Sequence, residues 1–290
     1  MKLEEINIRD PFVLLENEKY YLYGSRGKEA WGKCTGLDVY ISDDLNEWSP
    51  ALEVFSKPEN FWADMNFWAP EVHKYKNKFY MFVSFKSSDK RRGTQILVAD
   101  SPTGPFLEHS LGPVTPNDWE CLDGTFYIGG DNTPYIVFCH EWLQAIDGEI
   151  CAMKLSDDLK RSVGDPVVLF KASQSPHVSS VDNNGNFVTD GPFLYRNSRG
   201  RLFMLWSSYG KNKKYCELLA YSRNGEIDGE WIQCDEPLFT DDGGHGMIFK
   251  TKTNKLVFTM HTPNGTLLER PILLPATEFK DTITLEAPVK

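Results

Sequence analysis

Apolar runs separated by short polar turns recur five times along the chain. Each copy has a polar residue beside a Gly or Pro, then an apolar run, a polar turn and a second apolar run. Runs rich in Val, Ile, Phe and Tyr that are split by Asn, Gly, Lys or Asp are typical of β-hairpins. The sequence therefore predicts five hairpins, at 8–25, 67–85, 121–142, 189–208 and 243–264.

A second strand pair follows four of these hairpins. Each of these pairs has a strand-like run, a turn rich in Ser and Asp, and another run, at 37–55, 94–109, 149–170 and 217–239. The fifth hairpin is followed by a less regular segment, 270–287. A unit of this size cannot bury both of its faces alone, so neighbouring units must pack around an axis. We therefore expect an all-β fold: one five-bladed β-propeller with four-stranded blades over 1–290.

A polar residue near the start of each hairpin has a similar place in every unit. These anchors are 61, 52, 67 and 55 residues apart, and they are Asp10, Glu71, Asp123, Asp190 and His245. The first strand of a propeller blade lines the central axis, so the five side chains are expected to converge at one end. One Asp beside Gly or Pro is ordinary turn chemistry. Three at the same place in the repeat favour a functional cluster.

Crowded carboxylates repel one another unless they bind a cation or one of them keeps its proton. Glycoside hydrolysis needs such a division of pKa values. One carboxylic acid protonates the leaving oxygen, and one carboxylate activates water. The predicted cluster therefore favours a glycosidase.

Charge and hydropathy exclude several classes of partner. The chain has 290 residues, a net charge of −10 and no run of 18 apolar residues. We therefore expect no nucleic-acid partner and no membrane. The predicted glycosidase cluster implies a carbohydrate partner instead. The N-terminus lacks a basic and then apolar signal pattern, which predicts a cytoplasmic protein if Met1 is the natural start; a removed signal peptide is the alternative.

Five short motifs occur at blade spacing and in a fixed order: "IRDPF", "FWAPEV", "LDGTF", "DGPFLY" and "GGHGMIF". With them the chain resembles glycoside hydrolase family 43. The resemblance implies a five-bladed propeller that hydrolyses arabinose- or xylose-containing glycans with inversion. It matches Asp10 to the general base, Asp190 to the general acid, and Asp123 to the residue that orients the acid and adjusts its pKa. His245 matches a histidine on the axis that in many members helps to hold a calcium or a water, so an axial calcium is a further expectation.

The chain departs from the family pattern at Asp190, because the family has Glu in an "EGP" motif there. The Asp carboxyl is set back by roughly 1–1.5 Å, about one covalent bond. A misplacement of about 1 Å can cost on the order of a hundredfold in rate. Three outcomes follow: Asp190 acts nonetheless, Glu71 or Glu141 replaces it, or the protein is a catalytically weak glycan-binding propeller.

Several further side chains are expected at the mouth, where the second strand of each hairpin ends. Trp62, Trp68 and Trp142 are candidate walls for a sugar ring, with core packing as the competing role. Candidates for binding sugar hydroxyls are Glu71, Glu141, Arg26 and Lys86. A retaining glycosidase is a rival reading, but the single "RDP", in the first hairpin, favours inversion.

Overall fold

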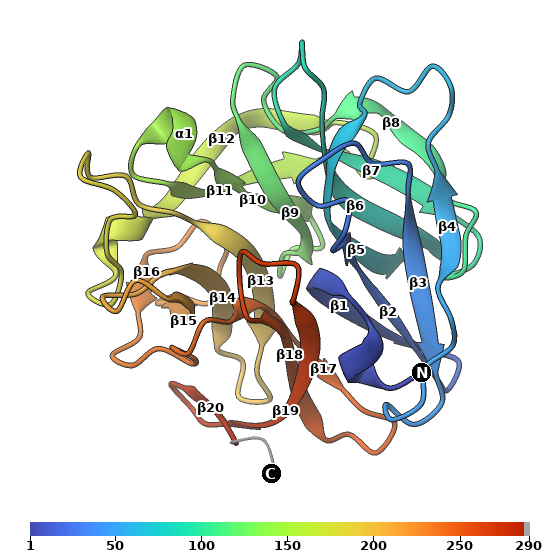
Figure 1. Ribbon diagram of the computed structural model, residues 1–290. Helices are drawn as coiled ribbons and strands as arrows, with labels where there is room; N and C mark the ends of the chain where they lie inside the picture. Colours follow the sequence, from blue (N-terminus) through green and yellow to red (C-terminus); the bar gives the residue numbers. More distant parts are fainter. Residues whose placement is uncertain (287–290) are drawn as a thin grey trace.

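The computed structural model describes residues 1–286. Five four-stranded antiparallel sheets surround a central axis, and in each sheet the strands lie in chain order from the axis outward (Figure 1). The prediction of an all-β, five-bladed propeller with four-stranded blades is confirmed. No helix in this described part is long and apolar enough to cross a membrane.

The first blade consists of β1 (Ile8–Glu16), β2 (Lys19–Arg26), β3 (Gly36–Ser42) and β4 (Leu52–Ser56). The second consists of β5 (Met65–Tyr75), β6 (Lys78–Lys86), β7 (Gly93–Ala99) and β8 (Leu107–Pro113). The third consists of β9 (Cys121–Ile128), β10 (Pro134–His140), β11 (Glu149–Leu155) and β12 (Ser162–Lys171). The fourth consists of β13 (Asp190–Arg196), β14 (Leu202–Tyr209), β15 (Tyr215–Ser222) and β16 (Trp231–Gln233). The fifth consists of β17 (Gly244–Lys250), β18 (Leu256–Thr262), β19 (Arg270–Glu278) and β20 (Ile283–Leu285).

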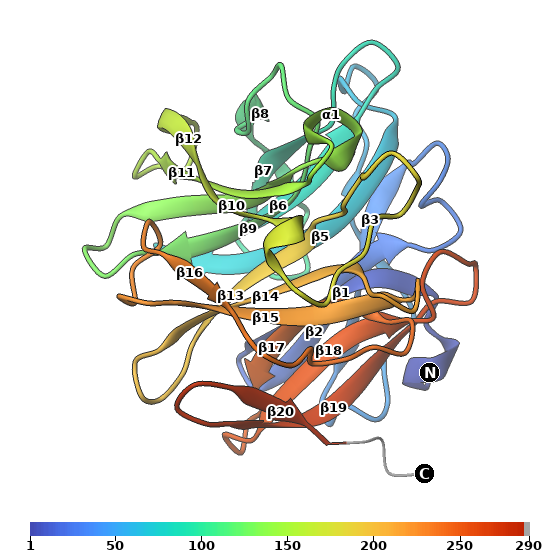
Figure 2. The ribbon, with the colours of Figure 1, turned by 90° about the vertical axis from the view of Figure 1, so that its left-hand side faces the viewer.

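Three short helical turns complete the described chain: η1 (Leu3–Glu5), α1 (Trp142–Ala145) and η2 (Ala172–Gln174). Figure 2 shows the stacked blades from the side. The apolar faces of neighbouring blades pack together and bury aromatic side chains, including Trp48 and Trp231. Burial of such large apolar surfaces is the main force that holds the blades together.

A β-bulge interrupts each innermost strand near its start. The pairing register shifts at this point in all five hairpins. The bulge residue has a φ between 47° and 55° in every blade, and these residues are Asp10, Ala69, Asp123, Gly191 and His245. Positive φ is uncommon for residues other than glycine, and bulges often redirect side chains beside functional sites. The same bulge in every blade therefore changes which side chains face the axis.

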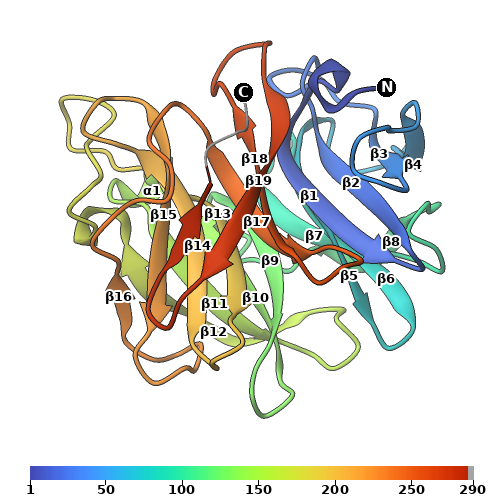
Figure 3. The same cartoon turned by 90° about the horizontal axis from the view of Figure 1, so that it is seen from below.

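Hydrogen bonds tie four of these bulges to the preceding blade. Ser25 Oγ accepts the backbone N–H of Ala69 at 2.8 Å, and Ser84 Oγ accepts that of Asp123 at 2.9 Å. The other two bonds follow the same plan. Ser207 Oγ accepts the backbone N–H of His245 at 2.6 Å, and His261 Nδ1 accepts that of Asp10 at 3.1 Å. The last bond joins the fifth blade to the first, whose strands lie side by side in Figure 3.

Candidate active site

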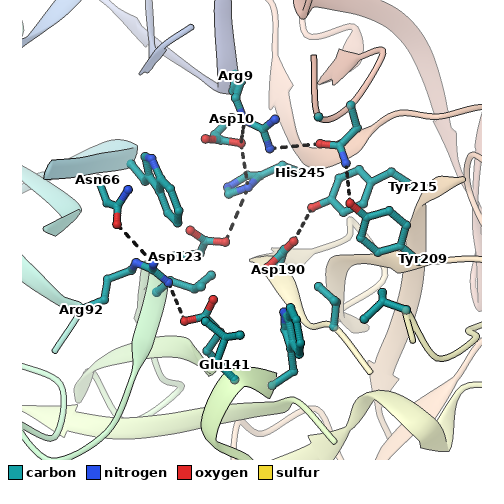
Figure 4. Close-up of a pocket in the computed structure, with 18 of the residues that line it drawn as sticks. Arg9, Asp10, Asn66, Arg92, Asp123, Glu141, Asp190, Tyr209, Tyr215 and His245 are labelled. Carbon is teal, nitrogen blue, oxygen red and sulfur yellow. Dashed lines mark hydrogen bonds and ion pairs between the residues drawn. The ribbon is translucent and has the colours of Figure 1, made fainter. Parts of the chain in front are cut away.

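A cavity of about 780 Å³ opens on the axis at the end where the innermost strands begin. All five blades contribute to its wall (Figure 4). The lining residues are Arg9, Asp10, Trp31, Asn66, Trp68, Arg92, Leu122, Asp123, Glu141, Trp142, Leu143, Val181, Asp182, Val188, Asp190, Tyr209, Lys213, Tyr215, His245, Asn264 and Gly265. The structure thus brings Asp10, Asp123, Asp190 and His245 to one site, as the repeat predicted.

The bulges explain why the site can hold so many acids, and they correct the predicted alignment of the repeat. Asp10, Asp123 and His245 are bulge residues, whereas Asp190 is the residue before its bulge and pairs with Ser207. Regular strands turn alternate side chains to opposite faces. The bulge breaks that alternation, so two successive positions, such as Arg9 and Asp10, both line the cavity.

Glycine is required in the "DGP" motif because Gly191 occupies the bulge position of the fourth blade. Its φ is 52°, and a Cβ atom there would lie 2.8 Å from Cγ of His245. The backbone N–H of Gly191 donates to Oδ2 of Asp123 at 3.0 Å. Asp123 therefore fixes the backbone next to Asp190. In the other four blades the bulge N–H is held instead by a side chain from the second strand of the preceding blade.

Asp10 is held as a carboxylate by its neighbours. Ser25 Oγ donates to its Oδ2 at 2.5 Å, and Nδ1 of His245 lies 3.2 Å from its Oδ1. Burial alone would raise the pKa of Asp10, but the His245 and Arg9 charges outweigh it and lower the pKa to about 2. Burial lowers the pKa of His261 to about 3, so this ring is neutral and its Nδ1 can accept the Asp10 N–H.

Asp190 has the opposite tendency. Burial and the nearby Asp123 charge raise the pKa of Asp190 to about 7, although the hydroxyl of Tyr215 donates to its Oδ2 at 3.0 Å. Burial and the Asp10 charge also raise the pKa of Asp123 well above its usual range. The Asp123–Asp190 pair therefore retains a proton at neutral pH, while Asp10 is ionised. The cavity can thus offer a carboxylate base and a protonated acid together.

Three of the predicted sugar-binding side chains line the cavity: Trp68, Glu141 and Trp142. Arg92, which the sequence did not single out, connects two of them. Its Nη1 donates to Glu141 Oε2 at 2.5 Å, and its guanidinium carbon lies 4.3 Å from the Trp68 ring centre. Its Nη2 donates to Asn66 Oδ1 at 3.2 Å. A buried cation is thus placed beside a carboxylate and an aromatic wall.

Glu71 and Arg26, also expected at the site, do not line the cavity. Glu71 lies two residues beyond the bulge of its strand and is turned into the packing between blades, where its Oε2 accepts from Thr125 Oγ1 at 2.6 Å. Arg26 Nη2 pairs with Asp38 Oδ1 at 2.5 Å and Glu53 Oε2 at 2.9 Å, both farther out in the same blade. Trp62 and Lys86 likewise lie outside this cavity. We therefore do not propose that Glu71 or Arg26 binds the sugar.

Trp31 and Tyr215 line the cavity without having been expected there. Trp31 is 60% exposed, and its ring centre lies 5.4 Å from that of Trp68. Trp31 lies in the connection between β2 and β3, and no motif indicates that it reaches the cavity. Tyr215 begins β15, a third strand, and no motif indicates that it reaches the axis.

His245 was expected to help hold a calcium. Its Nδ1 faces Asp10 Oδ1 and lies 3.7 Å from Asp123 Oδ2. Within residues 1–286, no group of three or more His, Cys, Asp or Glu side chains is arranged to hold a metal ion. These protein side chains alone do not fit a metal ion. The axial calcium stays a prediction.

Comparison with known proteins agrees with the fold and the motifs. An endo-arabinase from Bacteroides thetaiotaomicron VPI-5482 is 40% identical, with a TM-score of 0.90 over 97% of this chain and 98% of that one. The chain is 22% identical to the extracellular endo-alpha-(1->5)-L-arabinanase 1 of Bacillus subtilis (82% of this chain, 71% of the relative). It is 21% identical to the extracellular exo-alpha-(1->5)-L-arabinofuranosidase ArbA of Cellvibrio japonicus, over 71% of this chain and only 60% of the relative's length.

The model of one family, Glycosyl hydrolases family 43, matches residues 5–282, which is nearly the whole chain. This match confirms the resemblance carried by the five motifs. The chain belongs to Glycosyl hydrolases family 43 and is a glycosidase that hydrolyses glycosidic bonds.

Proposed function

We propose that the protein is an inverting hydrolase of arabinose-containing glycans and that it cleaves within the glycan chain. The observation that carries the mechanism is the divided ionisation of the cavity. Asp10 has a pKa of about 2 and Asp190 one of about 7, within the same buried site. A base and an acid that differ in this way are what single-step glycoside hydrolysis requires.

In the proposed reaction Asp10 takes a proton from a water molecule while the oxygen of that water attacks the anomeric carbon. The bond from that carbon to the glycosidic oxygen breaks, and Asp190 gives its proton to the departing oxygen. Asp123 positions Asp190 through the Gly191 N–H. Its proximity also raises the pKa of the acid, so that the proton is available near neutral pH.

Two observations support an arabinose-containing chain as the substrate. The relative with 40% identity is described as an endo-arabinase, and the Bacillus subtilis relative as an endo-arabinanase. The cavity of about 780 Å³ is large enough for several sugar rings rather than one. Trp31 and Trp68 offer apolar faces for those rings, and Glu141 offers a carboxylate for hydroxyl groups.

The test is hydrolysis of linear arabinan, arabino-oligosaccharides, and nitrophenyl arabinofuranoside and xyloside by the wild type, Asp10→Asn and Asp190→Asn. We expect arabinan to be shortened internally and each variant to lose about 10²–10⁴ in kcat/KM, the usual contribution of a general acid or base. Asp131→Asn is the control, because Asp131 is exposed in the turn between β9 and β10.

The stereochemistry is followed by NMR of the first anomer formed. An inverted anomer is expected, and a retained anomer would contradict the single-step mechanism. Sugar binding without turnover on any substrate would instead favour the alternative of a catalytically weak glycan-binding propeller. Full activity of Asp190→Asn with loss in Glu141→Gln would move the acid to Glu141.

A further inference from the structure

A second cavity, of about 550 Å³, adjoins the catalytic cavity on the second blade, and we name it the blade-2 cavity. Its lining residues are Trp62, Asp89, Lys90, Arg91, Arg92, Gly93, Leu111, Gly112, Pro113, Pro116 and Asn117. They come from the segment just before β5, from the connection between β6 and β7 with the first residue of β7, and from the end of β8 with the residues that follow it. These segments lie at the end of the blade where β5 begins, which is also the end that opens into the catalytic cavity.

Arg92 lines both cavities, so its side chain forms part of the wall between them. It is 5% exposed, and among residues 1–286 its buried Nε atom has no hydrogen-bond partner. A buried donor without a partner is unfavourable and normally finds one in protein, water or ligand. The wall shared by the two cavities therefore has an unused donor.

The blade-2 cavity is locally basic in a chain with a net charge of −10. Its lining has three cations, Lys90, Arg91 and Arg92, and one carboxylate, Asp89; Lys86 lies nearby. Glu120 is shared among them, at 3.0 Å from Lys86 and 3.8 Å from Arg91, and Glu141 pairs with Arg92. Within residues 1–286 Lys90 forms no direct ion pair, although the charge of Asp89 next to it offsets part of its own. The cluster therefore leaves positive charge to attract an anion.

An aromatic ring lies beside this charge. Trp62 is half-buried, and its Nε1 donates to Gln95 Oε1 at 2.6 Å, which fixes the plane of the ring. The Lys90 ammonium lies 5.8 Å from the centre of that ring. A fixed indole with a cation near its face suits a ligand with both an apolar ring face and a negative group.

We propose that the blade-2 cavity binds a carboxylated sugar residue, a hexuronate, of the glycan whose neutral part occupies the catalytic cavity. The sugar ring packs on Trp62, and its carboxylate faces Lys90 and Arg91. The proposal rests on the proposed function, because it assumes a glycan chain long enough to reach both cavities. A simple inorganic anion would satisfy the charges but would not pack on the indole face.

The test measures binding to the Asp10→Asn protein by calorimetry at low ionic strength. The probes are a galacturonate trimer, the galactose trimer with the same linkages, arabinotriose and inorganic sulfate. We expect at least about fivefold tighter binding of the galacturonate trimer than of the galactose trimer, since one or two partly exposed charge pairs contribute this order of preference. Lys90→Ala/Arg91→Ala is expected to remove the preference and to leave arabinotriose binding unchanged.

The matched control is Lys250→Ala/Lys255→Ala, which removes two exposed cations from the opposite end of the fifth blade. Equal binding of the two galactose-type trimers, or a preference that survives loss of Lys90 and Arg91, would overturn the proposal. Sulfate that competes at the same concentration as the galacturonate trimer would reduce the cavity to a plain anion site. Binding is read directly, so failure of arabinan hydrolysis by the wild type would count against the proposed function alone.

Discussion

The hydroxyl of Tyr215 is expected to set the pH at which the proposed acid loses its proton. It donates to Asp190 Oδ2 at 3.0 Å, and a donor to a carboxylate favours the charged form and so lowers its pKa. A hydrogen bond to a charged group contributes about 1.5–3 kcal/mol and one to a neutral group about 0.5–1.5 kcal/mol. Tyr215→Phe therefore removes about 1–1.5 kcal/mol of preference for the ionised form.

Because about 1.4 kcal/mol corresponds to one pH unit, the alkaline limb of the pH dependence of kcat/KM should move upward by about one unit. In the wild type this limb is expected near the pKa of Asp190, about 7. The assay is hydrolysis of an arabino-oligosaccharide between pH 4 and 10, with roughly one reading per half unit. Asp10, with a pKa of about 2, stays ionised over this whole range, so the activity below the alkaline limb should not change with pH through Asp10.

Tyr209→Phe is the matched control, because the Tyr209 hydroxyl also lies in the cavity but accepts from Asn264 Nδ2 at 3.1 Å and does not contact Asp190. An alkaline limb that stays in place or moves downward in Tyr215→Phe would refute the reasoning. The same result would count against Asp190 as the group that supplies the proton.

Two further predictions concern stability. Glu217 is fully buried, and its Oε1 has no hydrogen-bond partner in the described part of the chain. Burial raises its pKa from 4.5 to about 8, so the free energy of unfolding should fall as the pH rises from 4.5 to 8. Glu217→Gln should raise the free energy of unfolding at pH 7 by on the order of 2 kcal/mol and flatten that slope in denaturant titrations; an unchanged slope would contradict it. The axial calcium that the family resemblance implies is tested by returning calcium to protein treated with EDTA: a raised thermal midpoint would support it, and an unchanged midpoint, which the protein donors alone favour, would argue against it.

The pattern of apolar and polar residues was sufficient to predict the propeller. Strand pairs repeat at nearly constant spacing, and no single unit can bury its own faces, so packing around an axis follows from the repeat. The same repeat brought Asp10, Asp123, Asp190 and His245 together, although they are far apart in the chain. Local sequence therefore determined both the architecture and the centre of the site.

Side-chain direction could not be predicted in the same way. The start of each innermost strand contains a bulge, and a shift of one residue changes the face to which a side chain points. Glu71 is consequently directed between the blades, whereas Asp190, one residue before its bulge, still faces the cavity. Arg26 is at the expected end of its strand, but Asp38 and Glu53 hold it in its own blade.

The outer part of the site depended on tertiary structure. Trp31 lies in a loop, Arg92 just before a third strand and Tyr215 at the start of another, and none of them holds a repeated position in the sequence. Their place at the cavity follows from the closure of five blades around one axis, which brings third strands and connecting loops against side chains from other blades. The sequence by itself thus determined the fold and the acids on the axis. Only the packing of the blades decided which neighbours adjust the pKa values of those acids and which surfaces a glycan can reach.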